Sequence, residues 1–471
     1  MKRLVICLDG TWNQIDSGDA TNVVKMAQAV ALSDGDTKQV LYYDEGIGTE
    51  DGEGILDEAS NYWDGAFGHG LMKNLADAYS FLVLNYEVGD EIYVFGFSRG
   101  AFTARSLCGL IRNAGIVDRR HLVNIREAIN LYISRKATES PDSDYCRRFR
   151  NERQTGICLS QDLDWLRQNY PDEDHGSKTI LKVNFLGVWD TVGALGLPVP
   201  DEFKHVFNKK YGFHDTNLST FVHSARHAVS ADEKRNTFSP TLWANIDHLR
   251  SEYGDRYDEK IFPGTHSGVG GGGPIVGLSD ISFEWIFRGA EAAGLVFDKT
   301  DGAVIYRLQP NHLASLHNVR GKTSWSAKDW LMGVGTSTRE FARLTADDLH
   351  ESIIHRYHDD RLRRVPDGEY RPGSLSIVFN EIEHRKVEVK GVIDDRFNDL
   401  FDDSGLLVAP ARIVPHTIVV GEDLHAISKF HYGKDSFADL IFAHNFQLGR
   451  LHNKSQLYVG REIQIPFYDL F

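Results

Sequence analysis

The sequence predicts an α/β fold in which a mostly parallel sheet carries helices on both faces. Two observations support this class. Between residues 3 and 295, short runs rich in β-branched and aromatic residues alternate with stretches whose apolar residues recur at helical spacing. Polar turns that contain glycine follow several of the apolar runs. Strands that alternate with helices of this length indicate a parallel, doubly wound sheet.

The elements are expected in regular order along the chain. Those of the first part are strands at 3–8, 38–43 and 92–96 and helices at 22–31, 70–86 and 99–113. A highly charged segment at 119–178 then predicts a helical insertion over the sheet. After it come a strongly apolar strand at 179–189, a helix-to-strand pattern at 221–229 and a helix at 278–295.

Composition excludes several classes of protein. The 471 residues carry a formal net charge of -15 and no long basic run, which argues against a protein whose main task is to grip nucleic acid. No run of about 18 apolar residues occurs, so we expect no transmembrane segment. The four cysteines form no C-x-x-C pair, and we expect no bound metal and no other cofactor.

The N-terminus predicts where the protein is made. Its apolar run at 4–8 is too short for the core of a cleaved signal peptide, and no small-residue cleavage site follows. We therefore expect a protein made in the cytoplasm. If it acts at a target cell envelope, it leaves by a route that needs no cleaved signal.

The chain is organised around a G-x-S-x-G motif at 96–100. Ser98 lies between a predicted buried strand and a predicted helix, which is the setting of a nucleophile elbow. Gly96 and Gly100 allow the sharp turn that would lift the hydroxyl above the sheet. The backbone N–H of Arg99, at the start of the helix, would face a developing oxyanion. The alternative is a strand-to-helix turn with a capping serine.

A second turn follows the first predicted strand. Its Gly10 and Thr11 backbone is expected to form an anion-binding turn that faces Ser98 and completes the oxyanion hole. The alternative is a plain β-turn.

Two further residues complete a candidate nucleophilic site. Asp190 directly follows the apolar strand, at the sheet edge where open α/β folds place their chemistry. His266 lies in a glycine-rich loop after another short strand. With Ser98 they occur in the order Ser, Asp, His of α/β-hydrolases. Asp232 and Asp280 remain rival candidates for the acid.

Five motifs together resemble a known family. They are L-D-G-T-W-N at 8–13, G-F-S-R-G-A at 96–101, V-W-D-T-V-G at 188–193, F-P-G-T-H-S at 262–267 and L-S-D-I at 278–281. They are similar to a family of conserved hypothetical α/β-hydrolases that includes type VI secretion lipase effectors, and the resemblance extends to about residue 375. Gly268 and Gly273 depart from the family pattern, which usually has an aspartate and an aromatic residue there.

The resemblance implies an α/β-hydrolase-like fold and a serine carboxylic-ester hydrolase with Ser98, Asp190 and His266 as its triad. A phospholipid or another lipid ester would be the substrate, and secretion machinery or an immunity protein would be a partner. Two alternatives remain open. One is a non-catalytic envelope or secretion-associated binding protein on a hydrolase scaffold, and the other is an esterase for non-lipid esters.

The C-terminal segment is predicted to be a separate small domain. G-E-D-L at 421–424, A-x-N at 443–445 and G-x-x-I-x-I-P at 460–466 resemble a LysM module, the βααβ domain that binds N-acetylglucosamine-containing glycans. The resemblance implies a glycan groove lined by Gly421, Glu422, Asp423, Leu424, Asn445, Phe446, Gln447 and Leu448. The expected domains are a catalytic domain at 1–376, a linker or small extension at 377–415 and the LysM-like module at 416–471. A spacer or docking role for the module remains the alternative.

Overall fold

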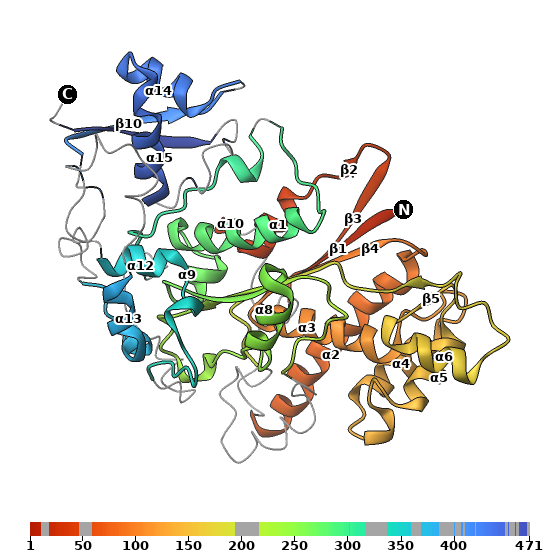
Figure 1. The fold of residues 1–471 in the computed structure, drawn as a ribbon. Helices are drawn as coiled ribbons and strands as arrows, with labels where there is room; N and C mark the ends of the chain where they lie inside the picture. The colour runs from red at the N-terminus through yellow and green to blue at the C-terminus, as the bar shows by residue number, and fades with distance from the viewer. Residues whose placement is uncertain are drawn as a thin grey trace.

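A seven-stranded sheet forms the centre of the protein (Figure 1). The computed structural model describes residues 1–10, 18–46, 59–193, 216–300, 302–316, 337–358, 369–385, 400, 407, 410–419, 421–447, 451, 457 and 461–468. The sheet strands are β1 Lys2–Leu8, β2 Ser33–Asp34, β3 Thr37–Asp44, β4 Glu91–Phe97, β7 Phe185–Trp189, β8 Ala225–Ser230 and β9 Tyr257–Phe262.

The strands run in the order β2-β3-β1-β4-β7-β8-β9. All neighbours pair in parallel except β2, which pairs antiparallel with β3 at one edge. The predicted mostly parallel sheet is therefore confirmed. The direction in which successive strands are added to the sheet reverses between β1 and β4. The strand that follows β1 on one side is β3, and the strand that follows β4 on the other side is β7. Such a switch point is where open α/β sheets place their ligands, beyond the carboxyl ends of the strands.

Helices cover both faces of the sheet, as predicted (Figure 1). One face packs against α1 Asn22–Ala29 and α10 Gly277–Ala292 through residues such as Val5 and Phe95. The other face packs against α2 Ala59–Asn85 and α3 Arg99–Ala114. Its contacts include Leu4 and Val94, the residues that precede Val5 and Phe95 in the chain. This alternation follows from the two-residue period of a strand. No helix in the described part of the chain combines the length and the apolar character that a membrane crossing needs.

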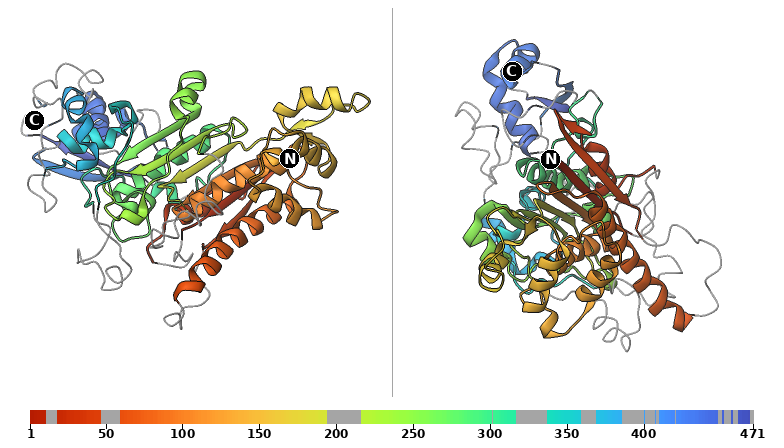
Figure 2. Two further views of the ribbon diagram at one scale, coloured as in Figure 1. Left: turned by 90° about the horizontal axis from the view of Figure 1, so that it is seen from below. Right: turned by 90° about the vertical axis from the view of Figure 1, so that its right-hand side faces the viewer.

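The charged segment after α3 forms a lobe beside the sheet (Figure 2). It contains α4 Val123–Ile133, α5 Asp144–Arg153, α6 Leu163–Asn169 and the strand pair β5 Ile157–Cys158 and β6 Thr179–Ile180. The prediction of a single strand at 179–189 is thus wrong. Of the two strands found there, β6 pairs with β5, and β7 joins the main sheet. Asn184 separates the two: its backbone N–H donates to the Ile92 carbonyl and its side-chain oxygen accepts from the Ile92 N–H.

The segment after α10 returns to the β9 edge. It contains α12 Glu351–His358 and α13 Phe379–His384, and α8 Ile246–Tyr253 lies between β8 and β9 in sequence. Residues of the predicted linker and tail enter one apolar cluster with the sheet residues Val229 and Ile261. They are Val378, Ile382, Leu400, Leu407, Leu440, Ala443 and Tyr468.

The tail has the order strand, helix, helix, strand. Its elements are β10 Arg412–Thr417, α14 Leu424–Tyr432, α15 Ala438–Gln447 and β11 Glu462–Phe467. The two strands pair antiparallel, and β10 begins four positions before the predicted boundary at 416. A second small apolar cluster, which includes Ile418, Ile427 and Ile463, lies within the tail.

One buried ion pair joins the tail to the sheet-covering helix α10. Arg461, which precedes β11, donates to Glu284 with Nη1–Oε1 and Nη2–Oε2 distances of 2.9 and 3.1 Å. The exposed fractions of these side chains are only 1% and 3%. Arg288 also donates to Oε1 of Glu284, at 2.6 Å. The tail is therefore anchored on the central sheet and its covering helix by charge as well as by apolar packing.

We expect Arg461→Met to lower the free energy of unfolding by about 3–5 kcal/mol, because it leaves the Glu284 carboxylate buried with one cation fewer. Chemical denaturation would measure the loss. Arg167→Met is the matched control: Arg167 forms an exposed pair with Asp164 at 2.9 Å, and its removal should change stability by less than about 1 kcal/mol. Equal effects of the two substitutions would contradict the anchoring role.

Candidate active site

Ser98 lies on a sharp turn between β4 and α3. Its φ of 59° and ψ of -121° are strained for a residue with a side chain. A Cβ on Gly96 would lie 2.5 Å from the carbonyl oxygen of Gly100, and one on Gly100 would collide with the carbonyl oxygens of Leu8 and Asp9. The two glycines of the motif are thus required by close backbone contacts. The turn has the strand–turn–helix form of a nucleophile elbow.

Gly100→Ala should therefore lower stability by roughly 1–3 kcal/mol or more, because backbone atoms of β1 must move to admit the methyl group. Thermal denaturation would test this by comparing the melting temperature of Gly100→Ala with that of a control variant, Gly18→Ala. An added Cβ at Gly18 meets nothing within 4 Å, so that substitution should be nearly neutral. A wild-type melting temperature for Gly100→Ala would contradict the packing of the elbow against β1.

The structure brings the three candidate side chains of the triad together. Ser98 Oγ donates to His266 Nε2 at 2.8 Å, and His266 Nδ1 donates to Asp190 Oδ2 at 2.6 Å. Because a carboxylate only accepts, the bond to Asp190 places the imidazole proton on Nδ1 and leaves Nε2 to accept from the serine. Ser98, Asp190 and His266 follow β4, β7 and β9, so all three lie at the carboxyl edge of the sheet.

The sequence predicted that His266 lies in a loop. In the structure it is instead the first residue of the short helix α9 His266–Gly270. The Val269 N–H donates to the Thr265 carbonyl, which closes this turn. The His266 N–H itself donates to Glu233 at 3.1 Å. The rings of Phe97 and Phe238 pack against the imidazole, with centroid distances of 4.6 and 4.8 Å. The imidazole is thus held from several sides.

Asp190 has a second partner that the sequence reasoning missed. The guanidinium of Arg339 donates to both of its carboxylate oxygens, with Nη1–Oδ1 and Nη2–Oδ2 distances of 2.7 and 2.8 Å. The Ser230 N–H also donates to Oδ1, at 2.9 Å. No sequence motif marks Arg339, which lies 149 positions after Asp190 in a segment without regular secondary structure.

Burial and charge act in opposite directions on Asp190. Burial raises its pKa, but Arg339 and His266 outweigh burial and hold the pKa well below its usual range. Burial lowers the pKa of His266, and the hydrogen bond from its Nδ1 to Asp190 opposes this only in part. At neutral pH the site thus holds an ionised carboxylate and a neutral imidazole, the state in which an imidazole can accept a proton from a serine.

The two rival aspartates have other partners. Asp232 accepts from the Gly264 N–H at 2.7 Å and from the Tyr370 hydroxyl at 2.9 Å, and burial raises its pKa to about 6. Asp280 accepts from Lys25 at 2.6 Å and from the Gln309 N–H at 2.7 Å. Among the three candidates, Asp190 alone has a described hydrogen bond to His266.

The predicted turn after β1 is only partly described. The Gly10 N–H donates to Oδ1 of Asp9 at 2.6 Å. Asp9 in turn accepts from Thr21 and Tyr43 on its other oxygen, at 2.5 and 3.0 Å. The role of Gly10 in an oxyanion hole stays a prediction, and Thr11 lies outside the described residues. Arg99 begins α3, directly after Ser98.

The predicted glycan residues lie at the turn before α14 and at the end of α15. Asp423 caps α14, and Glu422 accepts from His416 at 2.9 Å. Asn445 is fully buried, and its side chain bonds to both backbone groups of Gln464 in β11. These bonds hold β11 against the end of α15, and a glycan-binding role for Asn445 stays a prediction. Gly421 has a φ of 87°, and Leu424 is buried. Leu448 and the side chains of Phe446 and Gln447 lie outside the description.

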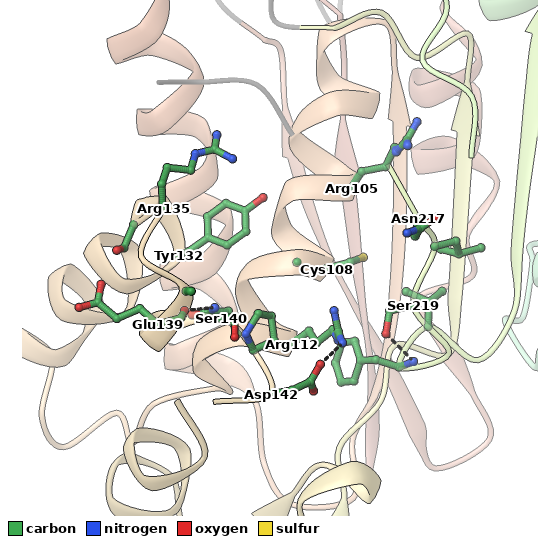
Figure 3. A pocket seen from close by; sticks show the side chains of 18 of the residues that line it. Arg105, Cys108, Arg112, Tyr132, Arg135, Glu139, Ser140, Asp142, Asn217 and Ser219 are labelled. Atoms are coloured by element: carbon green, nitrogen blue, oxygen red, sulfur yellow. Dashed lines mark hydrogen bonds and ion pairs between the residues drawn. The ribbon is translucent and has the colours of Figure 1, made fainter. Parts of the chain in front are cut away.

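A cavity of about 510 Å³ lies between α3, the segment after α4 and residues 217–222 (Figure 3). Its wall combines apolar residues such as Phe221 and Trp243 with four cations, Arg105, Arg112, Arg135 and Lys136. Arg112 pairs with Asp142 and Lys136 with Glu139, at 2.9 and 3.0 Å. None of the triad candidates is among the described residues that line it.

Comparison with known proteins adds to this geometry. A family model described as "T6SS, Phospholipase effector Tle1-like, catalytic domain" matches residues 2–289. An uncharacterized protein of Saccharomyces cerevisiae is 29% identical over 257 residues, which are 53% of this chain and 33% of that protein. The chain thus spans about a third of the length of this curated relative.

Two solved structures are also similar. An uncharacterized protein from Pseudomonas aeruginosa has a TM-score of 0.36 and 19% identity, and the match covers 63% of this chain and 46% of that one. The Tle1 effector bound to the VgrG spike from the Type 6 secretion system has a TM-score of 0.32 and 17% identity, with 59% and 52% covered. Since the family model matches more than half of the sequence and includes all three triad candidates, this chain belongs to the Tle1-like phospholipase effector family of type VI secretion systems.

Proposed function

We propose that the protein is a serine hydrolase that cleaves lipid carboxylic esters through an acyl-enzyme. The observation that supports this most directly is the continuous hydrogen-bond chain from Ser98 through His266 to Asp190. Ser98 Oγ attacks the ester carbonyl while His266 Nε2 takes its proton. His266 then protonates the leaving alcohol, and in the second half it activates the water that releases the acid.

Asp190 holds the proton on Nδ1 of His266 and stabilises the imidazolium that forms during each transfer. The Arg99 N–H is the proposed oxyanion donor, because it follows the nucleophile at the N-terminus of α3. The partial positive charge of a helix N-terminus favours an anion there. This mechanism needs no metal and no organic cofactor.

A phospholipid is the proposed substrate, because the family to which the chain belongs is one of phospholipase effectors. A fluorophosphonate probe would test the activated serine, since a non-catalytic scaffold would not label. A panel of phospholipids, neutral lipids and short soluble esters, with identification of the products, would then separate a phospholipase from an esterase for non-lipid esters. Absence of both labelling and hydrolysis in folded protein would overturn the proposal.

The family also supports delivery to a target cell by type VI secretion machinery. An immunity protein is proposed as a second partner. For the tail we propose a LysM-like module that holds the enzyme at envelope glycan. Its strand–helix–helix–strand order and its own apolar cluster support this proposal. Full-length protein should sediment with insoluble peptidoglycan or chitin. If it stays in the supernatant with both polymers, the tail is a docking module.

A further inference from the structure

We infer that Arg339 is a positioning residue of the proposed hydrolase site, which fixes the Asp190 carboxylate and offsets its negative charge. This inference rests on the proposed function. Arg339 lies outside residues 2–289, which the family model matches. The site is therefore completed by a segment that follows the matched catalytic region in sequence.

The first argument is geometric. Within the described part of the chain, Asp190 accepts four hydrogen bonds: two from Arg339, one from His266 and one from the Ser230 N–H. A carboxylate offers about four lone-pair sites, so these bonds saturate it. Rotation of the carboxylate away from His266 would break the bidentate pair with Arg339. The planar fork of an arginine suits this task, and the point charge of a lysine does not.

The second argument is that Arg339 links several parts of the site. Its Nη1 also donates to the carbonyl of Ser230, at the end of β8, and its Nη2 donates to the carbonyl of Phe238, at 2.7 and 2.6 Å. The ring of Phe238 packs against the imidazole of His266. One guanidinium therefore holds the acid, the end of the neighbouring strand and a residue that confines the base.

The third argument is electrostatic. Asp190 is fully buried, and a buried carboxylate without a cation would be costly to ionise. Arg339 lowers this cost, but it also weakens the attraction between Asp190 and a protonated His266. Removal of the positive charge should make it easier to add a proton to the Asp190–His266 pair. The pair should then titrate at a higher pH, whichever member carries the proton.

Other charged or titratable groups around the pair stay the same in every variant of Arg339. Those that interact electrostatically with Asp190 or His266 are His227, Glu233 and Arg235. A change in the titration of the pair can therefore be assigned to Arg339.

The experiment compares Arg339→Met, Arg339→Lys and Arg343→Met. Arg343 is the matched control, because it belongs to the same segment and its side chain is 85% exposed. Proton NMR of the full-length protein would follow the low-field proton of the His266–Asp190 hydrogen bond and the titration of His266, with His266→Gln for assignment. The pH profile of kcat/KM on a soluble ester would be measured in parallel.

For Arg339→Met we expect the titration midpoint and the acid limb of kcat/KM to move up by roughly one pH unit. Its kcat/KM at the optimum should fall roughly 10- to 100-fold, because a small displacement of a positioned group is enough for such a loss. Arg339→Lys should keep the titration midpoint of the Asp190–His266 pair, since the positive charge remains. It should broaden the low-field resonance, because the bidentate contact with Asp190 is lost. Arg343→Met should match the wild type.

An unchanged or lower midpoint in Arg339→Met, or a wild-type low-field resonance in Arg339→Lys, would overturn the inference. If Arg339→Met does not fold, the Arg339→Lys spectrum still decides the positioning role. The NMR measurements need no hydrolysis. If the wild-type serine fails to react with a fluorophosphonate, the proposed function fails, while the spectra still show whether Arg339 controls the Asp190–His266 pair.

Discussion

Ser98→Ala is expected to abolish ester hydrolysis, with a loss on the order of 10⁶-fold in kcat. The substitution removes the atom that donates to His266 Nε2 at 2.8 Å and that attacks the ester in the proposed mechanism. Labelling by a fluorophosphonate should disappear together with hydrolysis. Burst kinetics on an activated ester would show that the acyl-enzyme no longer forms.

The substitution should leave the fold intact, because alanine removes a single hydroxyl group. Ser98 has a φ of 59°, which any residue with a Cβ shares at the same cost, so stability should change little. A melting temperature near that of the wild type is therefore the control. Turnover that persists in such a folded variant would mean that another group is the nucleophile.

Asp190→Asn is expected to lower kcat by roughly 10⁴-fold. An amide at this position can donate to His266 Nδ1, which would favour the tautomer with its proton on Nε2. That tautomer cannot accept the proton of Ser98. Steady-state assays on a soluble ester would measure the decrease in kcat. His266→Ala serves as the reference for complete loss of the general base.

Two controls separate the chemistry of Asp190 from its structural role. Asp232→Asn and Asp280→Asn should each keep most of the activity, since neither carboxylate has a described bond to His266. A dead Asp232→Asn enzyme beside an active Asp190→Asn enzyme would mean that the acid is misassigned. Because Asp190→Asn also leaves Arg339 buried without its counter-ion, the double substitution with Arg339→Met should recover stability without recovering activity.

The features that sequence could predict depend on local pattern. Strand β4, the G-x-S-x-G turn and helix α3 are adjacent in the chain, so their periodicity and glycines indicate a nucleophile elbow directly. The parallel sheet follows from the alternation of strands and helices. Chain order then suggested Asp190 and His266, and the structure places both within hydrogen-bond reach of the expected partners.

The features that sequence could not predict depend on contacts between distant segments. Arg339 reaches Asp190 from an irregular segment with no periodicity. The hydrogen bond from the Gly10 N–H to the Asp9 carboxylate depends on how the turn packs, which the local sequence pattern does not show. Residues 179–189 look like one strand because apolar composition does not show which neighbour each residue pairs with.

The pair between Arg461 and Glu284 has a consequence for the order of events during synthesis. Glu284 leaves the ribosome 177 residues before its partner. Until then, the Glu284 carboxylate of α10 lacks the two hydrogen bonds that Arg461 donates. Since chains fold from the N-terminus as they emerge, we expect the nascent enzyme to mature late. The contact between α10 and the tail would thus form only after the strands of the central sheet have been made.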